Sequence, residues 1–591
     1  MADSPTKKSD KVLSCTVYVD GKDVGSDYRL VAAFVRTEIN RIGKASLQFD
    51  AGCMATQTFK ETDSDVFKPG KTIRLDVGTL DAEKTIFEGV VVMLNVEIDE
   101  QQRSRMAVEC RDALFAATLG RKNKVFEKQK DSEIISAVLG SYGSVSVDAT
   151  SFKHPALVQY YCTDWDFALS RADANGLLVT CAGKKIAVKK PEVGGSPVVT
   201  VTYGVDLIDF KGGVSATEQF AAVEAVSWDM AKQAVVKASA SKPKLNKQGS
   251  TAAADLETGD KYLLQTDAPV ESDVIKAWAD SMALKAGLAR YRGTFSFSGS
   301  AAVVPGCIVE LKGLGARFSG NVFVGAVEHT IREQVWTTRV DMGISPQNIT
   351  DEPDVTAPPA SGWLPGIEGL HIGKVKQLKG DPAGELRILV DIPVLNGDKN
   401  GIWARWATLY AGKDRGHFFL PEPDDEVVVG FINNDPGHPV VLGNMYSSKQ
   451  TAPYEFDDKN LKKVIVTKEK LKIEFDDEKK VITLETPGKN KIEINDDKKS
   501  IQLTDQNKNQ LTLTDQGITL DCAKNIVLKA KGDITLDSSG KVEVKSKADM
   551  TLEGMNVNVN AKVGLAAKGK ATAEISASGQ TTIKGGMVMI N

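Results

Sequence analysis

The C-terminal part of the chain carries a short repeat of apolar pairs, and this repeat constrains the fold more than any other feature. From Gly517 onward, two apolar residues separated by one other residue recur every eight positions. The pairs are Ile518/Leu520, Ile526/Leu528, Ile534/Leu536, Val542/Val544 and Met550/Leu552. Because side chains alternate between the two faces of a β-strand, both members of a pair lie on one face. We predict that these ten residues form the packing axis of a stacked β structure.

A strand of this kind cannot bury its apolar face alone, so the repeats must stack on one another. Eight residues form one side of a triangular prism. Either three repeats of one chain or one repeat from each of three chains closes a turn. Each fully buried Ile, Leu or Val contributes roughly 1.5–3 kcal/mol, whereas ordering the backbone of one residue costs about 1–2 kcal/mol. Only many stacked layers are therefore stable, and a stiff rod indicates a mechanical or interaction role.

The same apolar pairs occur upstream at steps of nine or ten residues, from Ile473/Phe475 to Leu511/Leu513. The intervening segments 476–480 and 487–490 are rich in Asp, Lys, Gly and Asn, which is typical of hairpin turns. The sequence therefore predicts an antiparallel meander that leads into the eight-residue coil.

Composition excludes several classes of protein. The net charge of −4 and pI of about 6.0 give no sequence-wide basis for binding nucleic acid or an anionic membrane. The polar segment 1–11 lacks the apolar core of a signal peptide, and no apolar run is long enough to span a membrane. The seven cysteines are scattered without metal-ligand spacing. We expect a protein made in a cytoplasm without a signal peptide.

At 591 residues the chain is long enough for several domains. Residues 1–350 are strand-rich, with helices expected at 131–142 and 164–175 and a polar surface loop or flexible insert at 238–257. The Pro/Gly/acidic segment 351–366 is typical of a linker. Short strands over 367–446 predict a small β-barrel. A connector at 447–460 then leads into the meander and rod at 461–591.

Several segments in the right order resemble the VgrG-type spike proteins of contractile injection systems, which are relatives of the phage tail hub-and-spike assembly. In the N-terminal region these segments are 163–167, 226–229, 305–306, 311–320 and 327–329. In the small barrel they are 403–407, 417–422, 425–431 and 435–443. The resemblance covers nearly the whole chain and includes both type VI secretion spikes and those of extracellular phage-tail-like particles.

This resemblance implies a mainly β protein with two hub β-barrels and a few helices, an OB-like barrel, and a C-terminal trimeric β-helix needle. Three chains close each turn of the prism. The homotrimer adapts a hexameric inner tube and its baseplate proteins to a threefold membrane-puncturing needle. The resemblance also implies that the spike is assembled into the injection particle, is expelled into a target cell or released extracellularly with the particle, and carries cargo effectors. The target membrane is contacted by puncture alone.

The C-terminal residues are the one predicted contact site for another protein. They are Gly585, Gly586, Met587, Val588, Met589, Ile590 and Asn591. The end of an apolar prism leaves unpaired backbone and an exposed apolar triangle, which is typical of an interaction site. The resemblance implies that a small PAAR-like tip protein caps the needle there.

No pattern of catalytic residues stands out, and we predict no catalytic site, no cofactor and no metal. The five histidines are scattered, without an HExxH motif or a close pair. We interpret His154 and His438, each before a proline, as turn or packing residues. Trp363, Trp403 and Trp406 could stack on bases, but the barrel segment lacks a basic groove, so core or subunit contacts are favoured and no nucleic-acid binding is predicted.

Two other classes of protein compete with the structural spike. A trimeric β-helical tailspike that degrades polysaccharide needs a groove with paired carboxylates and longer, irregular coils. A trimeric surface adhesin needs a secretion signal or membrane anchor. The tight eight-residue repeat and the polar N-terminus favour the structural spike over both, and we predict that the chain is not an enzyme.

Overall fold

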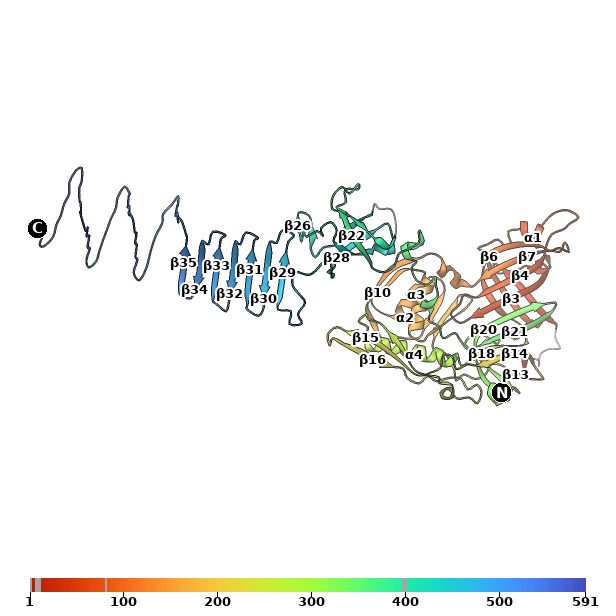
Figure 1. Cartoon of the computed structure of the whole chain (residues 1–591). Helices are drawn as coiled ribbons and strands as arrows, with labels where there is room; N and C mark the ends of the chain where they lie inside the picture. The colour runs from red at the N-terminus through yellow and green to blue at the C-terminus, as the bar shows by residue number, and fades with distance from the viewer. Residues whose placement is uncertain (1–2, 6–11, 80–81, 396–400, 591) are drawn as a thin grey trace. The chain divides into compact units, whose positions relative to one another are not determined.

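The computed structural model describes residues 3–5, 12–79, 82–395 and 401–590. The chain forms two compact units, residues 1–445 and 446–591, and each is described by itself (Figure 1). Strands dominate both units, which confirms the prediction of a mainly β fold.

A 13-stranded sheet is the framework of the first unit. Its strands are β1 (Leu13–Val19), β2 (Lys22–Asp23), β3 (Leu30–Glu38), β4 (Lys44–Asp50), β5 (Thr72–Thr79), β6 (Ala82–Ile98), β7 (Ser104–Arg111), β13 (Thr200–Thr202), β14 (Leu207–Val214), β18 (Tyr291–Ser298), β19 (Ile308–Lys312), β20 (Gly320–Arg332) and β21 (Val335–Met342). The order β14-β18-β21-β20-β3-β4-β7-β6-β5-β1-β2 joins strands from both ends of the region, and β19 pairs with β13 and β20.

The sheet has two lobes with separate cores. Strands β1 to β7 enclose one core around Phe49 and Phe67, whose ring centroids lie 4.8 Å apart. Strands β13, β14 and β18 to β21 enclose the other around Phe295 and Phe297. Antiparallel pairing of β20 with β3, which sets His329 opposite Val35, joins the lobes. The two hub barrels expected from the resemblance are thus two lobes of one continuous sheet.

A helical subdomain is inserted between the two lobes in the sequence. It holds α2 (Asp131–Leu139) and α3 (Asp164–Ala174). The two helices pack with β8 (Lys122–Lys130), β9 (Ser144–Val147), β10 (Lys153–Cys162), β11 (Leu178–Ala182) and β12 (Lys185–Lys189). Both helices confirm the sequence prediction. Helix α3 begins where the hydroxyl of Thr163 accepts a hydrogen bond of 3.0 Å from the N–H of Asp166, as an N-cap residue does.

Helix α4 (Ser272–Leu288) packs on a three-stranded sheet and was not predicted from the sequence. The sheet consists of β15 (Phe220–Asp229), β16 (Ala234–Ser239) and β17 (Gly259–Gln265). Short helices α1 (Lys60–Asp63) and α5 (Gly315–Phe318) lie in connections. The segment 238–257, predicted to be a surface loop or flexible insert, differs from that expectation because Asn246 and Gln248 within it are buried.

The small barrel at the end of the first unit is closed. Its strands are β22 (His371–Gln377), β23 (Ile388–Asp391), β24 (Ile402–Trp406), β27 (Glu426–Phe431) and β28 (Pro439–Asn444), and a short ribbon of β25 (Ala411–Gly412) and β26 (Arg415–Gly416) extends from it. Alternate residues such as Val427 and Val429 point into the core, and Val390 contacts them from β23. The predicted barrel is confirmed.

The second unit opens with a seven-stranded antiparallel meander. Its strands are β29 (Lys462–Val466), β30 (Lys472–Asp476), β31 (Val481–Glu485), β32 (Lys491–Asn495), β33 (Ser500–Thr504), β34 (Gln510–Thr514) and β35 (Gly517–Asp521). The turns at 477–480 and 486–490 are tight, with Lys480 and Lys489 at positive φ. The predicted meander and its hairpin turns are confirmed.

Candidate functional site on the C-terminal apolar face

The apolar pairs of the meander lie in register on one face of its sheet. Ile473 lies opposite Leu484, and Phe475 lies opposite Ile482. The same pairing of apolar residues continues from strand to strand until Leu511 faces Leu520. Residues directly opposite on one face of a sheet are in contact, so the pairs form two unbroken apolar rows across β30 to β35.

This apolar face is open to solvent in the single chain. The side chains of Ile482, Ile494 and Ile501 are 36%, 38% and 40% exposed. On the opposite face, by contrast, Thr483 and Asn495 are buried. A sheet that stands alone in water buries its apolar face and exposes its polar face, and this sheet does the opposite. The apolar face therefore has the character of an interface.

The polar face carries ion pairs within single strands and between neighbouring strands. Lys472 lies 3.1 Å from Glu474 on its own strand and 3.4 Å from Glu485 on the next. Lys491 pairs with Glu493 at 2.5 Å. These pairs are partly solvated and stabilise the sheet weakly, but alternating charge keeps this face in water.

Beyond Asp521 the chain runs as an extended zigzag whose legs lie far apart (Figure 1). Within residues 522–590, which are described without a gap, no segment pairs with another part of the chain as a strand. The predicted needle-axis residues lie at the end of the meander and on this zigzag, and all ten are exposed: Ile518, Leu520, Ile526, Leu528, Ile534, Leu536, Val542, Val544, Met550 and Leu552. Three consecutive repeats of one chain therefore do not close a turn here.

The predicted tip residues lie at the end of the zigzag. Met587, Met589 and Ile590 are 82%, 80% and 88% exposed. Gly585, Gly586 and Val588 lie among them and are also exposed. Asn591 lies outside the described residues. The part of the segment that is described presents apolar side chains to solvent, and their role in binding a tip protein stays a prediction.

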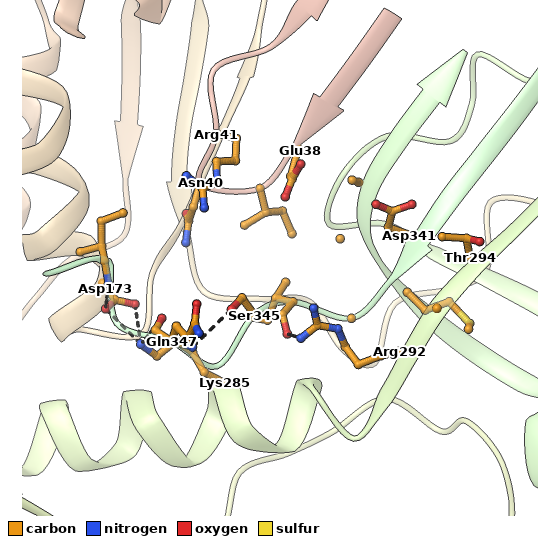
Figure 2. A pocket seen from close by; sticks show the side chains of 18 of the residues that line it. Glu38, Asn40, Arg41, Asp173, Lys285, Arg292, Thr294, Asp341, Ser345 and Gln347 are labelled. Carbon is orange, nitrogen blue, oxygen red and sulfur yellow. Dashed lines mark hydrogen bonds and ion pairs between the residues drawn. The ribbon is translucent and has the colours of Figure 1, made fainter. Parts of the chain in front are cut away.

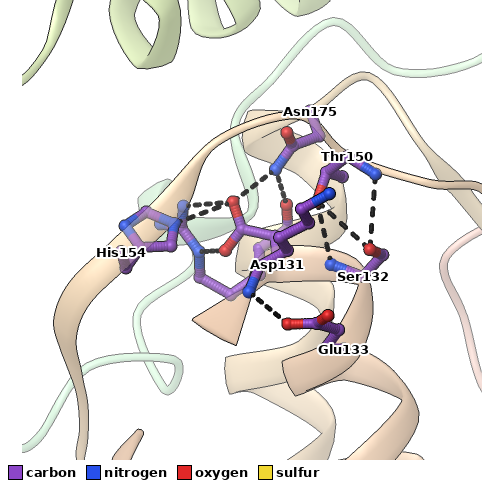
Figure 3. A network of polar contacts seen from close by, with 8 residues as sticks. Asp131, Ser132, Glu133, Thr150, His154 and Asn175 are labelled. Atoms are coloured by element: carbon purple, nitrogen blue, oxygen red, sulfur yellow. Dashed lines mark hydrogen bonds and ion pairs between the residues drawn. The ribbon is translucent and has the colours of Figure 1, made fainter. Parts of the chain in front are cut away.

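A buried carboxylate, which sequence reasoning missed, organises the helical subdomain (Figure 3). Asp131 accepts hydrogen bonds from Arg171 at 2.7 Å and from Asn175 at 2.9 Å. His154 lies on β10, not in the predicted loop, and its Nε2 is 3.1 Å from Asp131 Oδ2. Burial raises the pKa of Asp131, but the contacts with Arg171, Asn175 and His154 outweigh it and leave that pKa below its usual value.

A polar pocket of about 380 Å³ lies between the end of β3, α3, α4 and the second lobe (Figure 2). Its charged groups are largely paired within the chain. Lys285 is buried and lies 2.9 Å from Asp173, and Arg41 forms a two-pronged pair with Glu352. Because these charges are paired with one another, the pocket offers few free groups to a ligand. The ion pairs instead link segments of the chain that are distant in the sequence.

Neither a metal site nor a membrane-spanning helix is found among the described residues. Among the described residues, no group of three or more His, Cys, Asp or Glu is placed to hold a metal ion. Of the helices in the described ranges, none combines the length and apolar character that a membrane-spanning helix needs. Trp406 packs against the barrel core, whereas Trp363 is exposed and donates to Asp435 at 3.3 Å.

Comparison with known families covers most of the chain. Residues 9–333, more than half of the 591, match the family described as the Alg8 N-terminal domain. The chain belongs to this family. In addition to its Alg8 N-terminal domain, residues 371–446 match the type VI secretion system/phage-baseplate injector OB domain. Residues 480–591 match the phage baseplate V C-terminal trimerisation domain.

Curated relatives of this Alg8-family chain bear spike names, which confirms the resemblance found in the sequence. The type VI secretion system spike protein VgrG3 of Vibrio cholerae is 36% identical over 72 residues, which are 12% of this chain and 7% of that protein. The spike protein VgrG2a of Pseudomonas aeruginosa is 32% identical over 130 residues, 20% of this chain and 15% of that protein. The matched segments thus span a small fraction of these relatives. Another relative, from Vibrio cholerae, is named an actin cross-linking toxin.

The solved structures to which this chain is similar include a phage-type tail protein and a type VI secretion component. The 43 kDa tail protein of prophage MuSo2 from Shewanella oneidensis has a TM-score of 0.44 at 11% identity, covering 56% of this chain and 98% of that one. A type VI secretion component of Escherichia coli has a TM-score of 0.38 at 12% identity, covering 73% of this chain and 99% of that one.

The family matches coincide with elements of the fold. The OB-domain match begins at His371, the first residue of β22, and includes the closed barrel. The trimerisation match takes in β31 to β35, the zigzag and all ten needle-axis residues. The exposed apolar face thus lies mainly in the part of the chain that the family assigns to trimerisation.

Proposed function

We propose that this chain is the structural spike at the tip of a contractile injection machine. Three copies adapt a hexameric inner tube to a threefold needle that punctures a target membrane. The observation that carries the proposal is the apolar face that runs from β30 through the meander and continues on the zigzag to Ile590. After Asp521 it has no partner strand among the residues that the structure describes.

The zigzag supports three chains rather than one. An extended segment with unpaired backbone groups is stable only when other strands complete its ladders. Consecutive legs of the zigzag pair with no strand in the described part of the chain, so strands from two further copies are needed between them. The match to a trimerisation domain over 480–591 supports the same number.

The two lobes of the first unit support the adapter role. Each lobe has its own core, and the lobes are joined through β20 and β3. Two similar lobes per chain in a trimer present six lobes, which is the number that a hexameric tube and its baseplate proteins require. The closed barrel serves as the neck between this hub and the needle.

We also propose roles for the end of the needle and a route by which the chain leaves the cell. Residues Gly585 to Asn591 bind a small PAAR-like tip protein, and cargo effectors travel with the particle. The chain is made in the bacterial cytoplasm and is expelled with the particle or released with it. The chain itself catalyses no reaction, and sheath contraction supplies the force.

The mass of the purified chain in solution tests the proposal. Light scattering coupled to size exclusion is expected to give about three times the 63.6 kDa of one chain. A monomer that stays folded at micromolar concentration would contradict the three-chain needle, and with it the adapter role.

A further inference from the structure

A second cavity, separate from the C-terminal face and from the polar pocket, lies between α3, α4 and the segment that follows β16. Its volume is about 470 Å³. Its apolar lining, called the floor below, consists of Leu177, which is buried, with Leu284, Val193, Pro191 and Pro243. Lys190, Lys242 and Lys244 also line it. The site therefore combines an apolar floor with three ammonium groups.

The charges of the three lysines are only weakly balanced within the chain: the Asp148 carboxylate, which pairs with Lys189 at 3.0 Å, also interacts with the charge of Lys190. None of them forms an ion pair with any residue in the described ranges, and all three are exposed. The carboxylate that lines the cavity, Asp280, is already paired with Lys276 at 2.5 Å and also accepts a hydrogen bond from the N–H of Ser241. The cavity is thus positively charged, unlike the polar pocket.

Two of the lysines are presented by a fixed strap, residues 240–249. Its start is held on α4 by the Ser241–Asp280 contact and by Lys276, whose Nζ donates to the hydroxyl of Ser241 at 2.9 Å. Further along, the side chain of buried Asn246 donates to the carbonyl of Asn321 at 2.8 Å. Pro243 stands between Lys242 and Lys244 and restricts the backbone there. The lysines are therefore held at the cavity by an ordered backbone.

The opposite wall is equally fixed. Thr150 and Asn175, which line the cavity, belong to the network around Asp131 (Figure 3). Lys190 follows β12, and its backbone N–H donates to Asp148 at 2.9 Å. A cavity with both walls ordered before binding loses little conformational entropy when a ligand enters.

We propose that this cavity binds an acidic segment of a partner protein, with an apolar side chain on the floor and flanking carboxylates at Lys190, Lys242 and Lys244. Charge complementarity identifies the partner: three unpaired ammonium groups surround a floor with room for one or two apolar side chains. The inference does not depend on the proposed spike function, because it rests on the hub region alone.

The test uses the full chain and a defined probe. A fluorescein-labelled octapeptide that alternates glutamate with leucine is titrated with the protein, and fluorescence anisotropy reports binding. The Lys242→Glu, Lys244→Glu double variant is expected to bind about tenfold more weakly than the unaltered chain. The matched control is Lys184→Glu, Lys185→Glu. It makes the same charge change at two exposed lysines where the β11–β12 turn meets β12, and it is expected to bind normally.

Mapping the contact adds a second measurement. Carbodiimide coupling joins a glutamate of the probe to a nearby ammonium group, and peptide mass spectrometry is expected to locate the link at Lys190, Lys242 or Lys244. A probe with glutamine in place of glutamate is expected not to bind.

Several outcomes would overturn the proposal. The first is that the probe does not bind at millimolar concentration, which is the result expected if a neighbouring copy already fills the cavity. Equal binding by the glutamine probe is another. Displacement of the probe by an equal concentration of inorganic sulfate would identify a simple anion site, and displacement by a short oligonucleotide would identify a nucleic-acid site.

Discussion

Ile482 on β31 lies directly opposite Ile494 on β32, and both side chains are more than a third exposed. Directly opposite side chains on one face of a sheet are in contact, yet the single chain leaves this pair partly exposed to water. Burial of each side chain against other copies would contribute roughly 1.5–3 kcal/mol. The contact between the two isoleucines therefore fixes register within one chain, whereas their exposed surfaces stabilise an assembly.

The needle axis can be tested with Ile534→Asp. In a three-chain prism this substitution places three carboxylates in one apolar layer, and each buried, unpaired charge costs several kcal/mol. We expect loss of the trimer, measured as a fall in solution mass. Thr535→Asp is the control because its side chain alternates to the other face of the extended chain, and it is expected to retain the trimer. A normal trimer from Ile534→Asp would contradict the assigned face.

The buried histidine of the second lobe predicts a pH dependence. His329 lies between Trp336, whose Nε1 donates to its Nδ1 at 3.3 Å, and Thr338 at 3.0 Å. Burial lowers the pKa of His329 to about 4 from the 6.5 of an exposed histidine. The unfolded chain therefore binds a proton at pH values where the folded chain does not.

The stability that neutral His329 provides is fully present above pH 6.5 and is lost as the pH falls toward 4, by about 3 kcal/mol in total. Hydrogen exchange of β20 and β21 at pH 7 and pH 4.5 measures the loss. His329→Gln keeps a side-chain acceptor but does not titrate, so its two exchange profiles are expected to differ less. His371→Gln, at a half-buried position outside this network, is the control; equal pH dependence in all three proteins would contradict the assignment.

Regular patterns made much of this fold predictable from the sequence. The period-two pairs from Ile473 to Leu513 predicted the meander because every second residue shares a face. Helix α3 was expected from residue 164, and it begins directly after Thr163, which caps it. The apolar axis was predicted in the same way, but its closure depends on strands of other chains, which no local pattern contains.

Helix α4 and the strap were missed because tertiary contacts decide them. Helix α4 carries Lys, Asp and Ser between its apolar residues, and buried Lys285 is compatible with a helix interior only because it pairs with Asp173. The segment 238–257 has the composition of a loop, yet Asn246 and Gln248 are buried against distant strands. A carboxylate at the first residue of α2, with an arginine and an asparagine about forty residues later, was the available signal for the Asp131 network.

The needle tip can be tested by deleting 585–591. These residues follow the last apolar pair, so their loss removes no predicted axis residue, and the solution mass is expected to stay at three chains. Co-purification with a PAAR-like tip protein is expected to be lost. A control with Met587→Leu and Met589→Leu keeps the apolar surface and is expected to retain the tip protein. Retention of the tip protein by the deletion variant would place the contact elsewhere.

Arg290 is expected to hold the strap against the second lobe. Its guanidinium is buried and donates to the carbonyls of Gly287, at 2.8 Å, and Asn246. Burial lowers the pKa of this group. Arg290→Met keeps the length of the side chain but removes a charged donor from the carbonyl of Asn246, which then accepts only from the N–H of Gln248 at 3.1 Å. Loss of a hydrogen bond from a charged group costs about 1.5–3 kcal/mol.

Limited trypsin digestion reports whether the strap has loosened. In the intact chain, Leu245, Asn246 and Gln248 pack against other elements, so the bonds after Lys244 and Lys247 are expected to resist cleavage. Arg290→Met is expected to speed cleavage at both bonds by about tenfold, because proteolysis follows local opening. Arg292→Met, which alters an exposed arginine that donates to Ile344 at 3.0 Å, is the control. Equal cleavage rates in both variants would mean that contacts other than Arg290 fix the strap.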